Sequence, residues 1–565
     1  PASLPTSSRA RLSALSARAN SILAGAAALG SEFDLVVLQR LTGAPLDEIL
    51  RVLDLAGSAA IAVQVEEGRT RYRFVHSLIR EVLHRDLDDA TRMELHRKIV
   101  GVLEDLYRAE PDRHVDELAY HSMRSAQAGL ADKAIDYSIR AGEAAYAAFA
   151  YEKSARHWRE ALTLMEEQSA EPLKLARLLE RLSDALSITE VETPTGIDCL
   201  ERALRLYESA GRPLEAAHAH ARLAVMLSTR APSMNIQRAL HEYRQAEQVL
   251  GKAVESESQV WLYNGLAQAA MQAQHTAEEM AASHRGMEVA AHLGRDGLWT
   301  VAAAHHSDAL FHAGRLAEAS ALVDEAWHKA DRLDDLRGAF EAAWSGGYHL
   351  LGLWDPREGQ RWFTRELARP RMAEAAYQRQ ILMQQLAFGH VFRGRLRDAQ
   401  DILHEAPRAV VEGFALIYLG EPDKADRILD EARKAMRAAG SVDGETVCAY
   451  FQSLARTALD DLDTAESLVG RVIEAAVAGP IVPFELNARC EMALIAAKRG
   501  RIEIALEQVK RCREILSSGE DFRGLSGRAA LAEAVTAAGM SEHEAAAKFF
   551  SAACRNLTRY DLAWE

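Results

Sequence analysis

The segment Ala313-Gly314-Arg315-Leu316-Ala317-Glu318-Ala319 decides the fold, because it ends one run of helix-forming residues and opens another. Related turn phrases recur along the chain: Ala210-Gly211-Arg212, Arg393-Gly394-Arg395-Leu396, Leu419-Gly420-Glu421-Pro422, Arg499-Gly500-Arg501-Ile502 and Ala538-Gly539-Met540. From Gly314 onward their separations cluster near multiples of about 40 residues, with one shortened step at Gly420. This period predicts an α-solenoid of helical hairpins, which offers an elongated binding surface rather than a catalytic pocket.

Composition excludes several classes of protein. The 565 residues carry a formal net charge of -15, which argues against direct contact with nucleic acid, since phosphate binding needs concentrated Lys and Arg. The five scattered cysteines form no C-x-x-C pair, so they favour a reducing cytoplasm over a zinc site or a disulfide framework. No apolar run approaches the roughly 18 residues of a membrane span. The chain begins with Pro1 rather than Met, which suggests an excised piece of a longer protein.

Residues 1–110 differ from the remainder and predict a small winged-helix domain. Three helices are expected first, over residues 12–29, 34–41 and 45–55. Two alternating segments follow, 61–65 and 71–75, and the Gly-containing turn between them at 66–68 predicts a β-hairpin.

Residues 111–565 predict the solenoid. The stretch 151–162 resembles the second helix of a tetratricopeptide repeat, because Ser154, Trp158 and Ala161 stand at i, i+4 and i+7, where helices pack closely. Turns are expected near residues 129, 150, 194, 232, 274, 314, 354, 394, 420, 460, 500 and 539. The fold class is therefore all-α, with about eleven or twelve tetratricopeptide-like hairpins after a winged helix.

One segment, Arg71-Tyr72-Arg73-Phe74-Val75-His76-Ser77-Leu78-Ile79-Arg80-Glu81-Val82-Leu83, resembles the winged-helix junction of signal-transduction ATPases with numerous domains. That group includes large LuxR-type activators, the maltose-regulon activator, and ATPase modules attached to bacterial cyclases or kinases. The lead-in at 27–34 and the helix ending His96-Arg97-Lys98-Ile99 resemble the same family. The resemblance is specific over residues 12–107 and generic over 114–556. It implies a nucleotide-binding domain before the winged helix, a repeat arm that senses an inducer or partner protein, and an effector domain at one end.

The chain departs from that family pattern in two respects. No GxxxxGK[ST] loop occurs, and no basic effector module follows the last repeat. The resemblance therefore implies the sensor arm of a cytoplasmic bacterial signalling ATPase, in a transcriptional regulator, and no enzymatic activity or cofactor is expected in this chain itself. ATP or ADP would bind the full-length protein, the missing nucleotide-binding domain would be a partner, and activation would proceed through an oligomer. The alternatives are a freestanding scaffold for protein–protein interaction, or the regulatory part of a cyclase or kinase.

Two features of the predicted winged helix bear on function. A His at the position of His76 is implied by the resemblance to contact the phosphate of a bound nucleotide, and a donor at a helix start favours an anion. The competing interpretation is that His76 caps its helix or packs under the wing. The segment 45–54 carries three carboxylates and one Arg, so it is poorly suited to the DNA major groove.

The candidate ligand groove lies in a stretch rich in tryptophan. Six of the eight Trp fall between residues 261 and 362. We expect at least four of these six to fill the core, which leaves Trp344 as the best groove residue. The predicted groove residues, chosen by helical register, are Asp308, His312, Glu341, Trp344, Tyr348 and Gln384.

Metal binding and catalysis are not expected. His305 and His306 are adjacent on a helix and point about 100° apart, and only His305 and His312 share a face. Neither a Ser-His-Asp arrangement nor a Gly-rich phosphate loop is present in the sequence.

Overall fold

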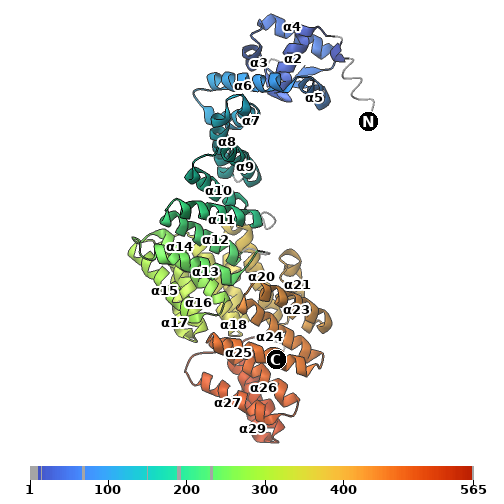
Figure 1. Cartoon of the computed structure of the whole chain (residues 1–565). Helices are drawn as coiled ribbons and strands as arrows, with labels where there is room; N and C mark the ends of the chain where they lie inside the picture. The colour runs from blue at the N-terminus through green and yellow to red at the C-terminus, as the bar shows by residue number, and fades with distance from the viewer. Residues whose placement is uncertain are drawn as a thin grey trace. The chain divides into compact units, whose positions relative to one another are not determined.

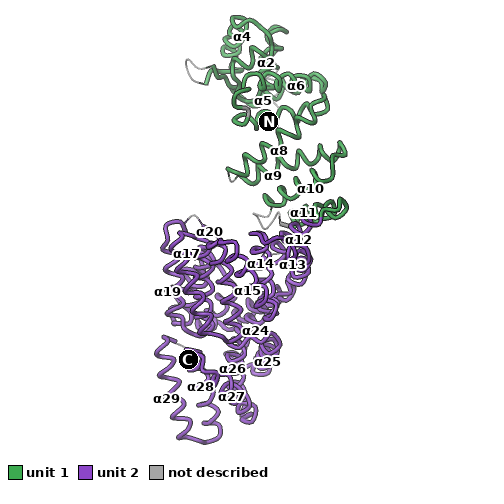
Figure 2. Tube along the Cα trace, turned by 90° about the vertical axis from the view of Figure 1, so that its left-hand side faces the viewer, with its two compact units in different colours: residues 1–212 green, residues 213–565 purple. Residues whose placement is uncertain are grey.

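The structure, a computed structural model, describes residues 11–13, 15–65, 70–148, 150–186, 193–229, 233–373 and 375–562. Helices dominate it (Figure 1). Backbone contacts divide it into two units, residues 1–212 and 213–565 (Figure 2). The predicted domain boundary near residue 110 stays a prediction. Side chains on either side of it, Val100 and Leu103 before and Leu118 and Tyr137 after, share one hydrophobic cluster.

The first unit begins with helices and a small sheet and continues as helix pairs. Its elements are α2 (Ala17–Leu29), β1 (Glu32–Asp34), α3 (Leu35–Thr42), α4 (Leu46–Ser58), β2 (Ala62–Gln64), β3 (Arg71–Phe74), α5 (Ser77–Arg85), α6 (Asp89–Leu106), η1 (Pro111–His114), α7 (Val115–Arg124), η2 (Ala126–Ala128), α8 (Ala131–Ala147), α9 (Tyr151–Glu167), α10 (Pro172–Leu186) and α11 (Thr193–Ser209).

The sheet has the strand order β1-β3-β2, and both pairings are antiparallel. The predicted pairing of β2 with β3 is confirmed, while its predicted turn at 66–68 lies outside the described residues. The third strand, β1, was not predicted, and the helix expected at 34–41 begins at Leu35. A strand of three residues has too little alternation to be recognised, but Phe33 packs against Phe74 with ring centroids 5.5 Å apart.

The pair α8 and α9 shows how these helices pack. Ser154, Trp158 and Ala161 are buried, as the sequence predicted. The Ser154 hydroxyl donates to the Gly142 carbonyl (2.8 Å), and a Cβ at Gly142 would lie 2.2 Å from the Trp158 indole nitrogen. Only glycine permits this close approach.

The second unit consists of helix pairs throughout its described residues. Its elements are α12 (Pro213–Thr229), α13 (Ile236–Leu250), α14 (Glu257–Gln272), α15 (Thr276–His292), α16 (Asp296–His312), α17 (Leu316–Arg332), α18 (Leu336–Gly352), α19 (Pro356–Leu367), η3 (Pro370–Ala373), α20 (Ala376–Phe392), α21 (Leu396–Glu405), α22 (Ala409–Tyr418), α23 (Pro422–Ala438), α24 (Val442–Ala458), α25 (Leu462–Ala478), α26 (Val482–Lys498), α27 (Ile502–Leu516), α28 (Gly524–Gly539) and α29 (His543–Arg559). Counted from α8 to α29, the described residues form eleven pairs, within the predicted range.

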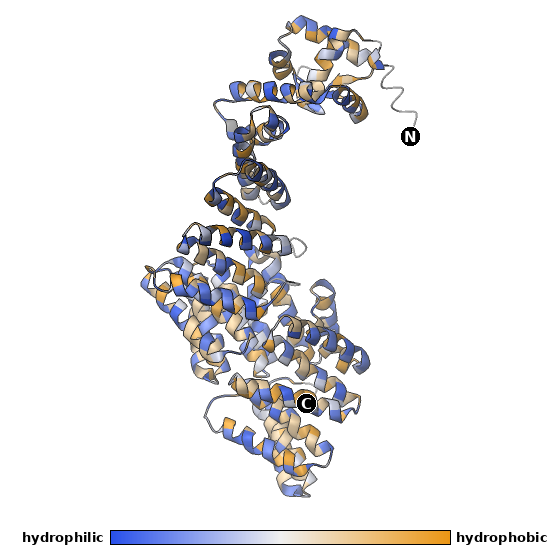
Figure 3. Ribbon diagram, in the orientation of Figure 1, coloured by the Kyte–Doolittle hydropathy of each residue, from blue (hydrophilic) through white to orange (hydrophobic). Residues whose placement is uncertain are grey.

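The period of 40 residues has a simple origin. Helices α15 to α18 each have 17 residues, and turns of three residues join them, so a new helix starts every 20 residues. The middle residue of such a turn is left-handed: Gly314 has φ +76° and Gly500 +71°. The N–H of Arg315 then bonds the Leu310 carbonyl (2.9 Å), which ends the helix. Most helices mix hydrophobic and hydrophilic residues along their length (Figure 3), as amphipathic packing requires.

The shortened step at Gly420 is confirmed. Helices α21 and α22 have only 10 residues each, whereas their neighbours α20 and α23 have 17.

The second unit coils tightly enough that distant segments touch. The Thr276 hydroxyl donates to the Gly479 carbonyl, 203 residues away. The N–H of Ala317 donates to the Glu520 carboxylate (2.9 Å), also 203 residues away. A further bond joins the Ile236 N–H to the Ala439 carbonyl (2.8 Å). The superhelix thus completes a turn and encloses its inner face.

Candidate functional site

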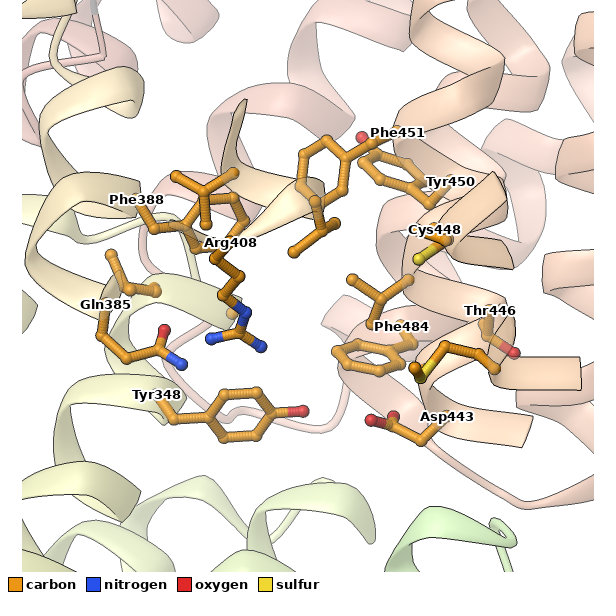
Figure 4. Close-up of a pocket in the computed structure, with 18 of the residues that line it drawn as sticks. Tyr348, Gln385, Phe388, Arg408, Asp443, Thr446, Cys448, Tyr450, Phe451 and Phe484 are labelled. Atoms are coloured by element: carbon orange, nitrogen blue, oxygen red, sulfur yellow. The ribbon is translucent and has the colours of Figure 1, made fainter. Parts of the chain in front are cut away.

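A cavity of about 400 Å³ lies on this inner face. Side chains from the first helices of successive pairs, with others from α23, α25 and the turn at Trp354, line it (Figure 4). The lining residues are Met271, Trp344, Tyr348, Leu351, Gly352, Trp354, Gln385, Phe388, Phe392, Arg408, Ala409, Val410, Val411, Ala432, Met436, Asp443, Gly444, Thr446, Val447, Cys448, Tyr450, Phe451, Val472, Phe484 and Asn487. A concave, aromatic site with a few polar groups is typical of a site for a small ligand.

The aromatic wall is held in place by its neighbours. Phe414, under the cavity, lies 4.5 Å from Phe451 and 5.1 Å from Phe392 between ring centroids. Trp354 meets Phe392 edge to face at 4.9 Å. Trp354 occupies the left-handed turn position with φ +59°, which is costly for a bulky residue. This conformation places an indole, rather than the usual glycine, at the edge of the cavity.

A buried ionic network supports the same wall. Arg528, 2 % exposed, forms an ion pair with Glu491 (2.8 Å) and donates to the Asn487 side-chain oxygen (2.7 Å). It also donates to the Tyr450 hydroxyl, and its guanidinium lies 4.2 Å from the centre of the Trp354 ring. These contacts fix Tyr450 and Trp354, so the wall is formed before any ligand arrives.

Arg408 brings a positive charge to the cavity. It precedes the first residue of α22, and its half-buried side chain makes no ion pair or hydrogen bond with any residue that the structure describes. Burial lowers its pKa, and the nearby Cys448, Tyr348 and Asp443 oppose that change. Figure 4 shows its guanidinium directed into the space beside the Tyr348 ring.

Asp443 brings a negative charge from another helix. It lies in the first turn of α24, and its Oδ1 is buried without a hydrogen-bond partner. Burial raises the pKa of this carboxyl group to about 6, although the neighbouring His312 lowers it. Glu279 also raises this pKa, while Gln274 and Arg408 lower it, so charged and polar groups surround the carboxyl group.

The cavity has no activated nucleophile in its described lining. Burial raises the pKa of the Cys448 thiol to about 11, so the thiolate is scarce at neutral pH. Burial also raises the pKa of Tyr348 well above its ordinary value. The arrangement suits binding rather than covalent chemistry.

Two of the predicted groove residues join neighbouring helices. His312, 1 % exposed, lies 3.1 Å from both oxygens of the Glu279 carboxylate on α15. Burial lowers the pKa of His312, but the carboxylates of Glu279, Asp443 and Asp308 overcome this and raise it to about 9. Asp308 accepts hydrogen bonds from the Ser345 hydroxyl (3.1 Å) and from His349 Nε2 (2.8 Å), which ties α16 to α18.

The other predicted residues occupy different surroundings. Trp344 and Tyr348 line the cavity, with their rings stacked at 5.2 Å. Glu341, together with Asp308 and Trp344, lines a second and wider hollow of about 970 Å³, and burial raises the Glu341 pKa. Gln384 donates to the Pro407 carbonyl (2.9 Å), and its neighbour Gln385 lines the cavity instead.

The expectation that at least four of the six clustered Trp are core residues is wrong. Trp327 and Trp354 are buried, and the other four, Trp261, Trp299, Trp344 and Trp362, are half-buried. Cations cover two of the half-buried rings: Arg337 lies 4.0 Å from the Trp261 centre and Lys329 4.4 Å from that of Trp299. Trp299 and Trp362 also pack against a hydrophobic core cluster, so core and surface side chains shield these indoles together.

His76 lies in the first unit, directly before α5. Its side chain is exposed and does not cap the helix. In the part of the chain that the structure describes, no group of three or more His, Cys, Asp or Glu is placed to hold a metal ion. Within that same part, no helix is both long and apolar enough to cross a membrane.

The sequence predicted no role for Arg408, Asp443, Phe451 or Phe484. They lie after the Trp-rich stretch and reach the cavity only because the superhelix curves back. The shortened step at Gly420 was the available signal, because Arg408 stands between the two short helices.

No family model matches the chain, and no curated protein matches it. Among solved structures, it is similar to a signal transduction ATPase with numerous domains that carries a tetratricopeptide repeat sensor, from Pyrococcus horikoshii. The identity is 14%, the TM-score is 0.31, and the match covers 95% of this chain and 66% of that one.

Two further solved structures are similar over much of their length. For a Rap protein complexed with Competence and Sporulation Factor, the identity is 10%, the TM-score 0.36, and the coverage 68% of this chain and 99% of that one. For the APC/C hetero-tetramer Cut9-Hcn1, the identity is 13%, the TM-score 0.43, and the coverage 82% and 94%. The repeat-solenoid architecture itself rests on the helix pairs described above.

Proposed function

We propose that this chain is a ligand-binding regulatory arm: the sensor portion of a bacterial signal-transduction ATPase with numerous domains, serving a cytoplasmic transcriptional regulator. The observation that carries the binding role is the cavity on the inner face, lined by Arg408 and Asp443, which form no ion pair with each other within the described residues. Its lining suits recognition and holds no activated nucleophile, so we assign the chain no catalysis.

The assignment to the ATPase family is supported by the first unit. Helices α2, α3 and α4 precede the β2–β3 pair, which is the order of a winged helix. The segment 71–83, which resembles the family's junction, contributes β3 and α5. On this proposal His76, exposed before α5, faces nucleotide held by a domain outside this chain.

Ligand binding would act on that junction by shifting a population. A ligand that binds one curvature of the superhelix more tightly than another stabilises that state by its difference in affinity. Because ordered helix pairs contact mainly their neighbours, such a change can pass from pair to pair along the array. The output is an active assembly of the full-length protein.

Two measurements test this proposal. A GxxxxGK[ST] segment encoded upstream in the same reading frame supports the ATPase assignment, and its absence from the native protein contradicts it. The binding role is tested by native mass spectrometry of the purified chain and of Trp344→Ala. We expect a copurifying small molecule in the parent protein and at least tenfold less of it in the variant.

Trp299→Ala is the matched control, because Trp299 is also half-buried but lies outside the cavity. It should keep the bound molecule. Equal retention by both variants, with unchanged helicity, would remove the cavity as the binding site.

A further inference from the structure

The two charged groups of the cavity come from different helices and do not satisfy each other. No ion pair joins Arg408 to Asp443 within the described residues, although each lies close enough to influence the pKa of the other. Figure 4 shows the Tyr348 ring beside the guanidinium, with its hydroxyl toward the Asp443 carboxyl group. A ligand between them would meet a cation at one end and an anion at the other.

The positive end is reinforced by the backbone. Arg408 directly precedes α22, and the first three residues of that helix, 409–411, also line the cavity. The Val411 N–H bonds the Arg408 carbonyl (3.0 Å), whereas the N–H groups of a helix's first residues otherwise lack an intrahelical partner and favour a negative charge. A guanidinium offers a planar pair of donors that fits a carboxylate. This end of the cavity therefore suits a carboxylate.

The negative end suits an ammonium group. Gln274 lies beside this carboxyl group and lowers its pKa, but the buried Asp443 Oδ1 accepts no hydrogen bond from the described residues and can accept one from a ligand. The ring of Phe484 lines the same part of the cavity (Figure 4), and aromatic faces favour cations. His312, which lowers the pKa of Asp443, is already paired with Glu279.

Charge balance selects between ligand classes. Glu279 and His312 neutralise each other, and Arg408 and Asp443 leave the cavity with one charge of each sign. A simple anion would satisfy Arg408 and leave Asp443 unpaired in an apolar site, and a simple cation would do the reverse. Leaving a buried charge unpaired is costly, so a ligand that carries both charges is favoured.

We propose that the cavity binds a small zwitterion with an apolar body, an amino acid or a short peptide, whose carboxylate meets Arg408 and whose ammonium group meets Asp443. The apolar body lies among Phe388, Phe451 and Phe484. A volume of about 400 Å³ accommodates a molecule of this size. This inference rests on the proposed function, since it names the ligand class of the same site.

The test is a thermal-shift screen of the full chain against the free amino acids and a set of apolar dipeptides, followed by calorimetry on the best binder. We expect at least one member to bind. Its N-acetylated and C-amidated forms should each bind at least tenfold more weakly, because each lacks one charge.

Variants assign each end of the ligand. Arg408→Gln should bind the parent compound and its C-amidated form about equally, because the partner of the carboxylate is gone. Asp443→Asn should bind the parent compound and its N-acetylated form about equally, because the partner of the ammonium group is gone. Arg395→Gln and Asp423→Asn are matched controls: Arg395 precedes α21 as Arg408 precedes α22, and Asp423 lies exposed in the first turn of α23. Both control variants should still bind the parent compound at least tenfold more tightly than its C-amidated and N-acetylated forms.

Three results would overturn the inference: no member of the screen binds, the blocked forms bind as tightly as the parent, or the controls lose discrimination as the cavity variants do. A copurifying molecule without a zwitterionic head, lost in Trp344→Ala, would also overturn it while leaving the proposed function intact. If Arg408→Gln loses its helical circular-dichroism signal, the carboxylate end of the ligand is tested with Arg408→Lys instead. That variant keeps the charge and should retain most of the preference for the carboxylate.

Discussion

Two sets of charges, one buried and one half-buried, lie at the inner face of the superhelix, and they differ in their partners. In the set between α15 and α18, Glu279 pairs with His312 and Asp308 bonds His349. In the set between α22 and α24, Arg408 and Asp443 form no ion pair within the described residues. The two sets are coupled electrostatically, because the Asp443 carboxylate raises the pKa of His312.

The difference separates structural charges from binding charges. A buried charge is tolerated when an opposite charge and hydrogen bonds compensate it, and it then couples the elements that supply the pair. Glu279 and His312 join α15 to α16 in this way. Arg408 and Asp443 have no such compensation, so they raise the free energy of the empty protein and lower that of a complex.

The largest effect is expected where a paired charge loses its partner. Glu279→Ala leaves the buried His312 without its carboxylate and should lower the free energy of unfolding by about 3–5 kcal/mol. Urea unfolding followed by circular dichroism measures this. Glu278→Ala is the control, because Glu278 pairs with Arg244 nearer the surface (2.7 Å), where an ion pair contributes about 0–1 kcal/mol. Equal losses in both variants would contradict the assignment of Glu279 as a structural charge.

The same pair predicts a pH dependence. The pKa of His312 is about 9 in the folded protein against 6.5 in the unfolded chain. The folded state therefore holds a proton that the unfolded state has released between these values. The protonated His312 contributes about 3 kcal/mol at most to the free energy of unfolding. This contribution is fully present below pH 6.5 and is lost as the pH rises to 9.

Unfolding free energies measured from pH 6 to pH 9.5 check this slope. The groups that raise the His312 pKa are Glu279, Asp443 and Asp308. Removing the first of them in Glu279→Gln should flatten the slope by about half or more. An unchanged slope in that variant would show that His312 is not the titrating group.

Much of the fold could be predicted from the sequence, because glycines recur at the turns with the period of the helix pairs. Gly314, Gly394 and Gly500 occupy left-handed positions that few other residues adopt, so their spacing reveals the helix lengths. Turns where Gln274, Asp334 or Asp460 holds that position carry no such signal. Strand β1 was not predicted because its own three residues carry no local signal, and its pairing with β3 depends on residues about 40 positions away.

The site could be predicted only in part. Helical register brought Trp344 and Tyr348 to the inner face, where they line the cavity. Helical register could not show that Asp308 and His312 would form hydrogen bonds and ion pairs with side chains on neighbouring helices. Nor could it place Arg408 and Asp443 opposite each other, since that depends on the curvature of the superhelix. Pairing between helices, rather than position on one helix, separates the two sets of charges.

An unpaired charge should behave in the opposite way to Glu279. Arg408→Met replaces the guanidinium with an apolar side chain in an aromatic cavity, and should raise the unfolding free energy of the ligand-free protein by about 1–3 kcal/mol. Thermal unfolding after exhaustive dialysis measures the gain. Arg395→Met, outside the cavity, should change stability by less than about 0.5 kcal/mol. A loss of stability in Arg408→Met would show that this charge holds the fold, and the contrast between the two sets would fail.

The smallest expected effect concerns two hydroxyl groups, one beside each set of charges. Ser345→Ala removes a buried donor to Asp308 and should cost about 1–2 kcal/mol, because the carboxylate loses part of its compensation. Thr446→Val alters the cavity wall, where the hydroxyl only bonds the Val442 carbonyl of its own helix (2.7 Å), and should cost less than about 1 kcal/mol. Urea unfolding of both variants gives the comparison. If Thr446→Val is the more damaging, the cavity wall depends on its polar groups for stability, and the division into structural and binding charges would have to be redrawn.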